Sequence, residues 1–86
     1  MGIYPNYKSI KGIKILDWNN GVTIYEYGLE SILNNEDILK AQHIYNNLPN
    51  KEGIEIRVYV SVWTTYEINN TPFYQWYPIE SFKELE

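Results

Sequence analysis

The feature that most constrains the fold is a run of alternating residues from Ile54 to Ile68, IEIRVYVSVWTTYEI. Its even-numbered positions are apolar, β-branched or aromatic, and the positions between them include both charged and aromatic residues. Alternation with period two is typical of a strand that turns one face to a core. At about 3.3 Å per residue this strand would extend about 50 Å, whereas strands usually have about 5–6 residues. The pattern therefore predicts a strand that bends at a bulge, or one whose end pairs outside its own domain.

The chain is short and has few means of stabilisation other than apolar burial. It has 86 residues, 16% of them aromatic, and no cysteine. We expect one domain, residues 1–86, near the lower end of the sizes that fold alone. With no disulfide and no metal-ligand motif, stability must come from a core or from association of copies. No signal peptide or run of about 20 apolar residues is apparent, so we expect a cytoplasmic protein without a membrane anchor.

Charge is distributed unevenly along the chain. The net charge of −4 argues against a general nucleic-acid binder, which needs a basic surface to displace counterions. Lys8, Lys11 and Lys14 nevertheless outnumber Asp17 among the first twenty residues. An acidic body with a basic edge suits either a basic protein partner or a small anion near the lysines. It also suits solubility alone.

The first half of the chain predicts a β-hairpin after an irregular lead-in, residues 1–12. Two apolar runs, Ile13–Trp18 and Val22–Tyr27, flank Asn20-Gly21, which is a strong hairpin signal. A two-residue loop would place Trp18 opposite Thr23. The register then predicts two face sets, Leu16, Trp18, Tyr25 and Tyr27 on one side and Ile13, Ile15, Val22 and Ile24 on the other.

A helix should follow the hairpin. The stretch Leu29–Leu33 allows two interpretations, a turn or a continuation of the second strand past a bulge at Gly28. We favour the continuation, because a long later strand needs a long partner. Asn34 or Asn35 is a suitable N-cap for a helix that runs to about Asn47. Its apolar arc is formed by Ile38, Ala41, Ile44, Tyr45 and Leu48, which is typical of an amphipathic helix laid on a sheet.

The second half predicts two more strands and a short helix. After the long strand, Asn69–Pro72 should turn the chain into a strand at Phe73–Tyr77. Pro78 suits the first position of a C-terminal helix, Ile79–Leu85. The expected fold is therefore α+β: a four-stranded antiparallel sheet in the order β-β-α-β-β-α. The amphipathic helix should pack on the even-numbered face of the long strand.

Catalytic motifs are absent from the sequence. His43 is the single histidine, there is no cysteine, and the glycines do not form a phosphate-binding loop. Convergence of Asp17, Glu26, Glu55 and Glu67 across strands remains open as an acid–base possibility. We expect a protein that is not an enzyme and uses no cofactor or metal.

The chain contains nine tyrosines, three tryptophans and two phenylalanines. Tyrosine and tryptophan combine a large apolar ring with a polar group and are therefore enriched at interfaces. Arg57, the only arginine, alternates onto the same strand face as Tyr59 and Trp63. An arginine beside rings can bind a phosphate while the rings stack on a base. The predicted ligand-binding residues are Arg57, Tyr59, Trp63, Tyr25, Tyr27 and Trp76; alternatively, Trp18, Tyr45, Trp63 and Phe73 belong to the core.

Two functions of different classes fit these observations. The first is a non-catalytic, oligomeric binding protein that sequesters a nucleotide-like or other planar anionic ligand on an aromatic face or subunit seam, because so small a chain hardly encloses a ligand alone. The second is a small acidic inhibitor or adaptor that docks on a larger basic protein. A single-stranded nucleic acid fits less well, because no positive groove is evident. The order β-β-α-β-β-α is too general to indicate a function by itself.

Overall fold

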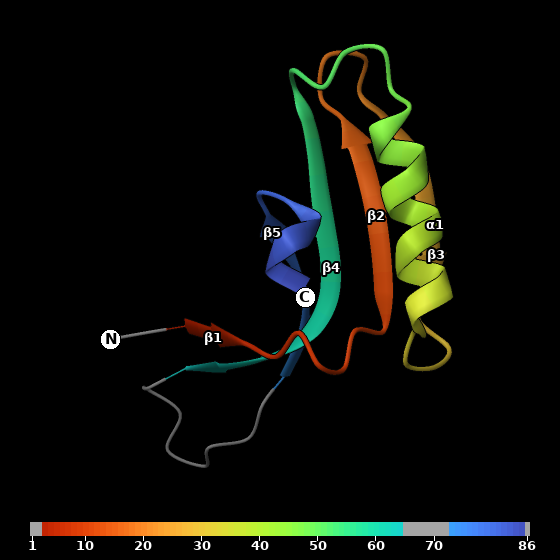
Figure 1. Cartoon of the computed structure of the whole chain (residues 1–86). Helices are drawn as coiled ribbons and strands as arrows, with labels where there is room; N and C mark the ends of the chain where they lie inside the picture. Colours follow the sequence, from red (N-terminus) through yellow and green to blue (C-terminus); the bar gives the residue numbers. More distant parts are fainter. Residues whose placement is uncertain (1–2, 65–72, 86) are drawn as a thin grey trace.

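The chain forms one antiparallel β-sheet with its helical segments on the same side of the sheet (Figure 1). This computed structural model describes residues 3–64 and 73–85. No helix in these two ranges is long and apolar enough to span a membrane. The elements are β1 (Ile3–Pro5), β2 (Gly12–Asp17), β3 (Val22–Gly28), α1 (Asn35–Asn46), β4 (Ile54–Thr64), β5 (Phe73–Ile79) and the 3-10 helix η1 (Phe82–Leu85).

Strand β4 is the centre of the sheet. One of its edges pairs first with β2 and then with β1, its other edge pairs with β5, and β3 lies beyond β2. The segment between β1 and β2 stays on β4: the Asn6 N–H donates to the Ser61 carbonyl at 2.9 Å, and the Lys11 N–H to the Tyr59 carbonyl at 2.8 Å. The α+β class and the antiparallel sheet are confirmed. The additional strand β1 lies where we expected irregular structure.

The long strand bends. β4 has 11 residues and curves strongly toward its C-terminal end, where it pairs with β1 (Figure 1). Eleven residues extend about 36 Å, which fits within the longest dimension of the molecule, 45 Å. The described part of the strand therefore needs no second chain to accommodate its length. Thr65–Ile68 and the turn expected at Asn69–Pro72 lie outside the described residues.

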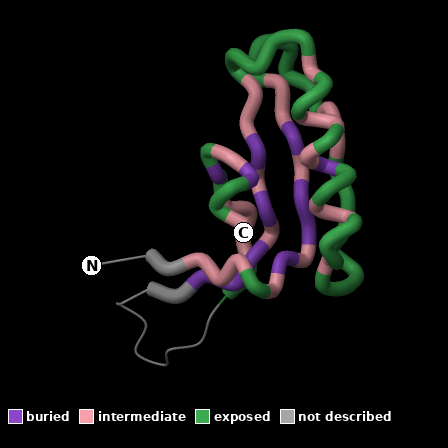
Figure 2. The backbone as a smooth tube through the Cα atoms, viewed as in Figure 1, coloured by how far each residue is buried: buried purple, intermediate pink, exposed green. Residues whose placement is uncertain are grey.

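The even-numbered face of β4 lies in the core, as predicted. Figure 2 shows the buried stretches running along β2 and β4, with exposed residues around them. Ile13 lies opposite Val58 and Ile15 opposite Ile56, so the buried residues of neighbouring strands meet on one side of the sheet. The buried apolar side chains are Ile10, Ile13, Ile15, Ala41, Ile56, Val58, Val60, Val62, Ile79 and Phe82.

The two helical segments cover this same face. At the start of α1, the Asn34 side chain accepts from the Asp37 N–H at 2.9 Å, and the Asp37 carboxylate accepts from the Asn34 N–H at 3.1 Å. This capping box explains why the helix begins here. Tyr45 of α1 packs edge-on against Phe82 of η1, with ring centroids 5.8 Å apart. Because Phe82 belongs to the same core cluster as Ala41, α1 and η1 leave the opposite face of the sheet uncovered.

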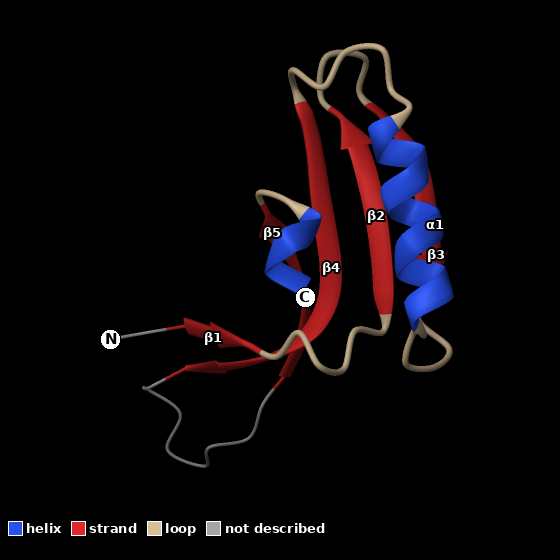
Figure 3. Cartoon of the chain, viewed as in Figure 1, coloured by secondary structure: helices blue, strands red, loops and turns tan. Residues whose placement is uncertain are grey.

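The predicted C-terminal helix is present only as the short η1. Pro78 does not start a helix: it continues β5 opposite Arg57, and Ile79 follows it opposite Ile56 (Figure 3). Proline is tolerated on an edge strand, where its missing N–H points away from the sheet. Burial of Ile79 favours this extension of the strand, and the helical turn starts three residues later, at Phe82.

The predicted hairpin register is wrong because the turn is longer than two residues. Asp17 pairs with Val22, so Trp18–Gly21 form the turn. The Asp17 carboxylate accepts from the backbone N–H groups of Asn19 and Asn20, at 2.9 and 3.2 Å, and from the Asn20 side chain at 2.7 Å. The hydrogen bond from the Asn20 side chain is the main reason that the pKa of Asp17 lies below its ordinary value. Asparagine and aspartate therefore stabilise a wider turn here.

A bulge in β3 then changes which residues share a face. Leu16 pairs with Thr23 but Ile15 pairs with Tyr25, which leaves Ile24 as the extra residue. From this point Tyr25 and Tyr27 lie on the side of the buried isoleucines of β2, whereas the predicted face sets placed them on the other side. A one-residue shift exchanges the two faces of a strand.

The interpretation of Leu29–Leu33 as a continued strand is also wrong. β3 ends at Gly28, where φ is 117°, and Leu29 follows with φ 81°. Two consecutive positive φ angles reverse the chain, and the Leu29 N–H donates to the Lys11 carbonyl at 2.6 Å. A glycine adopts this region freely, but a leucine does so at a cost of about 1–3 kcal/mol. The turn brings Leu33 back to Ile10, with an N–H to carbonyl distance of 2.8 Å.

The core assignment predicts a large difference between two isoleucines. Ile13 is completely buried and Ile32 is 56% exposed. We expect Ile13→Ala to lower the free energy of unfolding by about 2–5 kcal/mol, through lost burial and a residual cavity. Ile32→Ala, the matched control, should change it by less than about 0.5 kcal/mol. Urea unfolding followed by circular dichroism measures both, and equal losses would contradict the assignment.

Candidate functional site

Three aromatic rings form a cluster on the uncovered face of the sheet. Tyr59 of β4 lies directly opposite Trp76 of β5, and their ring centroids are 5.2 Å apart at an interplanar angle of 57°. Tyr59 also stacks on Tyr74, its diagonal neighbour on β5, with a centroid separation of 5.6 Å and an angle of 20°. Cross-strand and diagonal neighbours on one face are close enough for such ring contacts. The sheet therefore presents a continuous aromatic surface across β4 and β5.

Two lysines from the β1–β2 segment and β2 lie over these rings. The Lys11 ammonium is 4.5 Å from the centroid of Tyr74, and the Lys14 ammonium is 4.2 Å from the centroid of Trp76. Both distances are within the range of cation–π attraction, worth about 0.5–1 kcal/mol at exposed sites. Lys14 lies opposite Arg57 on β4, so a third cation joins the same face. We call Lys11, Lys14, Arg57, Tyr59, Tyr74 and Trp76 the aromatic face.

Arg57 has interactions of its own. Its Nε donates to the Glu55 carboxylate, and its guanidinium carbon lies 5.7 Å from the ring centroid of Trp18. Trp18 is 59% exposed, which excludes the alternative that it belongs to the core. Among the described side chains, this is the one ion pair; Lys11 and Lys14 have no carboxylate at such a distance. The aromatic face is therefore locally positive on a chain with a net charge of −4.

The lack of a side chain at Gly12 leaves room for the ring of Trp76 in the aromatic cluster. A Cβ at this position would lie 3.0 Å from Cη2 of Trp76, 3.0 Å from Cδ2 of Leu29 and 3.3 Å from Cβ of Tyr59. The Trp76 ring therefore occupies part of the volume that a side chain at residue 12 would take. A glycine within a strand often marks such a close approach.

The structure separates the ligand-binding residues predicted from the sequence into two groups. Arg57, Tyr59 and Trp76 lie together on the aromatic face. Tyr25 and Tyr27 lie on the opposite face, because the bulge in β3 places them beside Ile15 and Ile13. Burial raises the pKa of Tyr25, and the nearby Tyr27 and Asp37 add to this effect. The side chain of Trp63 lies outside the described part of the structure.

Lys11, Lys14 and Tyr74 were missed among the site residues. Their contribution depends on the pairing of β2 and β5 with β4, which places Gly12 and Trp76 on either side of Tyr59. The available signals were the basic N-terminal segment and the aromatic run Phe73–Tyr77. Neither signal indicated that the two segments flank the same strand.

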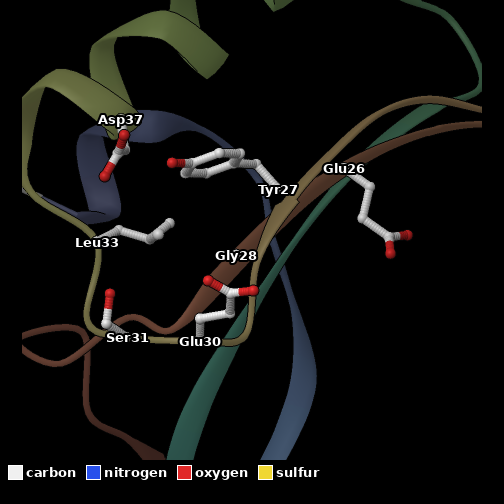
Figure 4. A pocket seen from close by; sticks show the side chains of 7 residues that line it. All are labelled: Glu26, Tyr27, Gly28, Glu30, Ser31, Leu33 and Asp37. Atoms are coloured by element: carbon white, nitrogen blue, oxygen red, sulfur yellow. The ribbon is translucent and has the colours of Figure 1, made fainter.

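A pocket of about 300 Å³ opens between the end of β3, the turn after it and the start of α1 (Figure 4). The Tyr27 hydroxyl points toward Asp37, whereas the Glu26 side chain points away from the cavity. The carboxylates make the pocket acidic and suited to a cationic group, but the described residues contain no cluster of three potential metal ligands. The lining residues are Glu26, Tyr27, Gly28, Glu30, Ser31, Leu33 and Asp37.

We expect Gly12→Ala to displace the Trp76 ring, because the new methyl group would lie 3.0 Å from it. The near-ultraviolet circular dichroism of the aromatic cluster should change while the far-ultraviolet spectrum, which reports the sheet, is retained. The control is the same substitution in a Trp76→Leu background, where the near-ultraviolet change should largely disappear. An unchanged near-ultraviolet spectrum of Gly12→Ala would show that the ring does not depend on this space.

No protein-family model, curated protein or solved structure matches this chain. The chemistry of its own surfaces is therefore the basis for inferring a function. Two surfaces of the chain have a chemistry of their own, the aromatic face with its cations and the acidic pocket.

Proposed function

We propose that this chain is a non-catalytic binding protein that takes a planar, anionic, nucleotide-like ligand on the aromatic face. The observation that supports this most is the position of the Lys11 and Lys14 ammonium groups, 4.5 and 4.2 Å from the centroids of Tyr74 and Trp76. A flat ring system that displaces these two lysine side chains from the ring faces and stacks there brings its own phosphate or carboxylate within reach of the ammonium groups. Sequestration of the ligand is the role that needs no further chemistry.

The expected affinity of a single aromatic face is modest. Stacking of one base contributes about 1–3 kcal/mol, and each exposed ion pair contributes about 0–1 kcal/mol. Together with two lysines this gives roughly 1–5 kcal/mol, and a dissociation constant of 1 mM corresponds to about 4.1 kcal/mol. Arg57 adds little until it is released from Glu55. We therefore expect binding near the millimolar range for one chain and one simple nucleotide.

Isothermal titration with ATP, adenosine and inorganic triphosphate tests this proposal. ATP should bind at least about ten times more tightly than either fragment, because only ATP combines a ring with negative charge. Trp76→Leu should weaken ATP binding about 5–10-fold, equivalent to roughly 1–1.4 kcal/mol, and Lys14→Gln about 2–5-fold, equivalent to roughly 0.4–1 kcal/mol. The control, Lys40→Gln, removes a cation from the exposed side of α1 and should leave the affinity unchanged. Equal effects of the three substitutions would reject the aromatic face as the site.

The acidic pocket favours a second candidate function, an acidic adaptor or inhibitor that docks on a basic protein. Glu30 and Asp37 contribute two carboxylates to the lining of a cavity open to solvent, and the Tyr27 hydroxyl points toward Asp37 (Figure 4). A lysine or arginine of a partner fits such a cavity, and carboxylates around it would steer the encounter. Asp37 also caps α1, so Glu30 is the better residue to change.

Under this second proposal, Glu30→Lys should weaken the binding of a lysine-rich peptide at least about fivefold, roughly 1 kcal/mol. The matched control is Glu52→Lys, which makes the same charge change in the exposed turn before β4. Fluorescence anisotropy of the labelled peptide at low ionic strength measures both variants. If Glu52→Lys weakens binding as much as Glu30→Lys, attraction by the total charge explains the result and the pocket has no specific role.

A further inference from the structure

The aromatic face is an exposed surface and not an enclosed pocket. Tyr74 is 38% exposed, and the side chain of Arg57 is 33% exposed. The acidic pocket beside the end of β3 and the pocket beside the hairpin turn are both lined by other residues. Small-ligand sites usually bury about 70–90% of the ligand surface. A planar ligand stacked on this face contacts the protein through one side and leaves its other side in solvent.

We propose that a second copy of this chain covers the exposed side of the ligand, so that two aromatic faces enclose one planar polyanion. This inference rests on the proposed function of the face. A two-fold axis through the ligand presents the same rings and the same cations to both of its sides. Within the described chain, α1 and η1 lie on the opposite side of the sheet (Figure 1). Neither of them covers the face that the second copy would meet.

Charge makes this pairing depend on the ligand. The face carries Lys11, Lys14 and Arg57, and the strand positions on the same side add two carboxylates, Glu55 and Glu26. Two locally positive surfaces repel each other when they approach without a counterion. A polyanion between them is attracted to both, because it meets cations on each of its sides. The dimer therefore forms with the ligand and not without it.

The same geometry sets the stoichiometry. One ligand lies between two chains, so the dimer is most abundant when the ligand is present at half the concentration of the protein. When the ligand is in excess, each aromatic face takes a ligand of its own, and the layer of negative charge on each face separates the chains. A dimer that first forms and then dissociates as ligand is added distinguishes a bridging ligand from one that acts at a distance.

Native mass spectrometry and sedimentation velocity of the full chain test this inference, with pyrene tetrasulfonate as a planar polyanion. The expected result is a monomer alone, a complex of two chains and one ligand at half-molar ratio, and mainly monomers with one ligand each in excess. Ligand-bound monomers at every ratio would overturn the second copy but leave the proposed function intact. A dimer without ligand would overturn the dependence on the ligand. No binding at any ratio would overturn the proposed function and the inference together.

A charge reversal at the border of the face tests the role of charge in the pairing. Glu26→Lys replaces a carboxylate opposite Lys14 with a cation and removes no ring or cation of the face. Because the polyanion then meets an additional cation on each of its sides, we expect at least tenfold more ligand-bridged dimer at about 0.05 M salt, at a protein concentration where little wild-type dimer forms, and a smaller difference at about 0.5 M salt, where screening is stronger. Glu36→Lys is the matched control, because residue 36 is exposed on α1, which packs on the covered side of the sheet. Equal changes in the amount of dimer in both variants would contradict face-to-face pairing.

Discussion

The fold depends on the antiparallel pairing of β4 on both of its edges. A strand with neighbours on both edges forms its backbone hydrogen bonds within the sheet. Its side chains alternate between the two faces, so one face can pack in the core while the other is exposed. The even-numbered side chains, such as Val58 and Val60, are completely buried. The odd-numbered side chains, Arg57 and Tyr59 among them, point the other way. Because α1 and η1 both contribute to the even side, the rings on the odd side remain accessible.

The partition of the aromatic residues between the two faces is decided in β3. A wide turn held by the Asp17 carboxylate and one extra residue, Ile24, place Tyr25 and Tyr27 over the core side. Without this bulge they would have joined the aromatic cluster, as the sequence pattern suggested. A single inserted residue thus determines that one face is a ring cluster with cations and the other is a core beside an acidic pocket.

What the sequence predicted correctly follows from signals that are local. The alternation of β4, an N-cap at Asn34 or Asn35 and a turn at Gly21 depend on residues close together in the chain, and each was identified from the sequence. The reciprocal hydrogen bonds between Asn34 and Asp37 were not foreseen. The register of the hairpin, the extension of β5 through Pro78 and the lysines over the rings depend on which strands become neighbours. Both faces of the hairpin are half apolar, so hydrophobic pattern did not select a register. Arg57 and Tyr59 lie on the odd-numbered face of β4, as its alternation predicted, and Trp76 joins them because β5 pairs with β4.

The turn after β3 joins the two surfaces of the molecule physically. Leu29, held at φ 81°, reaches the space above Gly12 next to Trp76, while Glu30 and Ser31 of the same turn line the acidic pocket on the other side. A lengthened or shortened turn would therefore alter the border of the ring cluster and the wall of the pocket in one step. Sequence changes in this turn should therefore affect both surfaces during evolution, because neither surface can change through the turn while the other stays as it is.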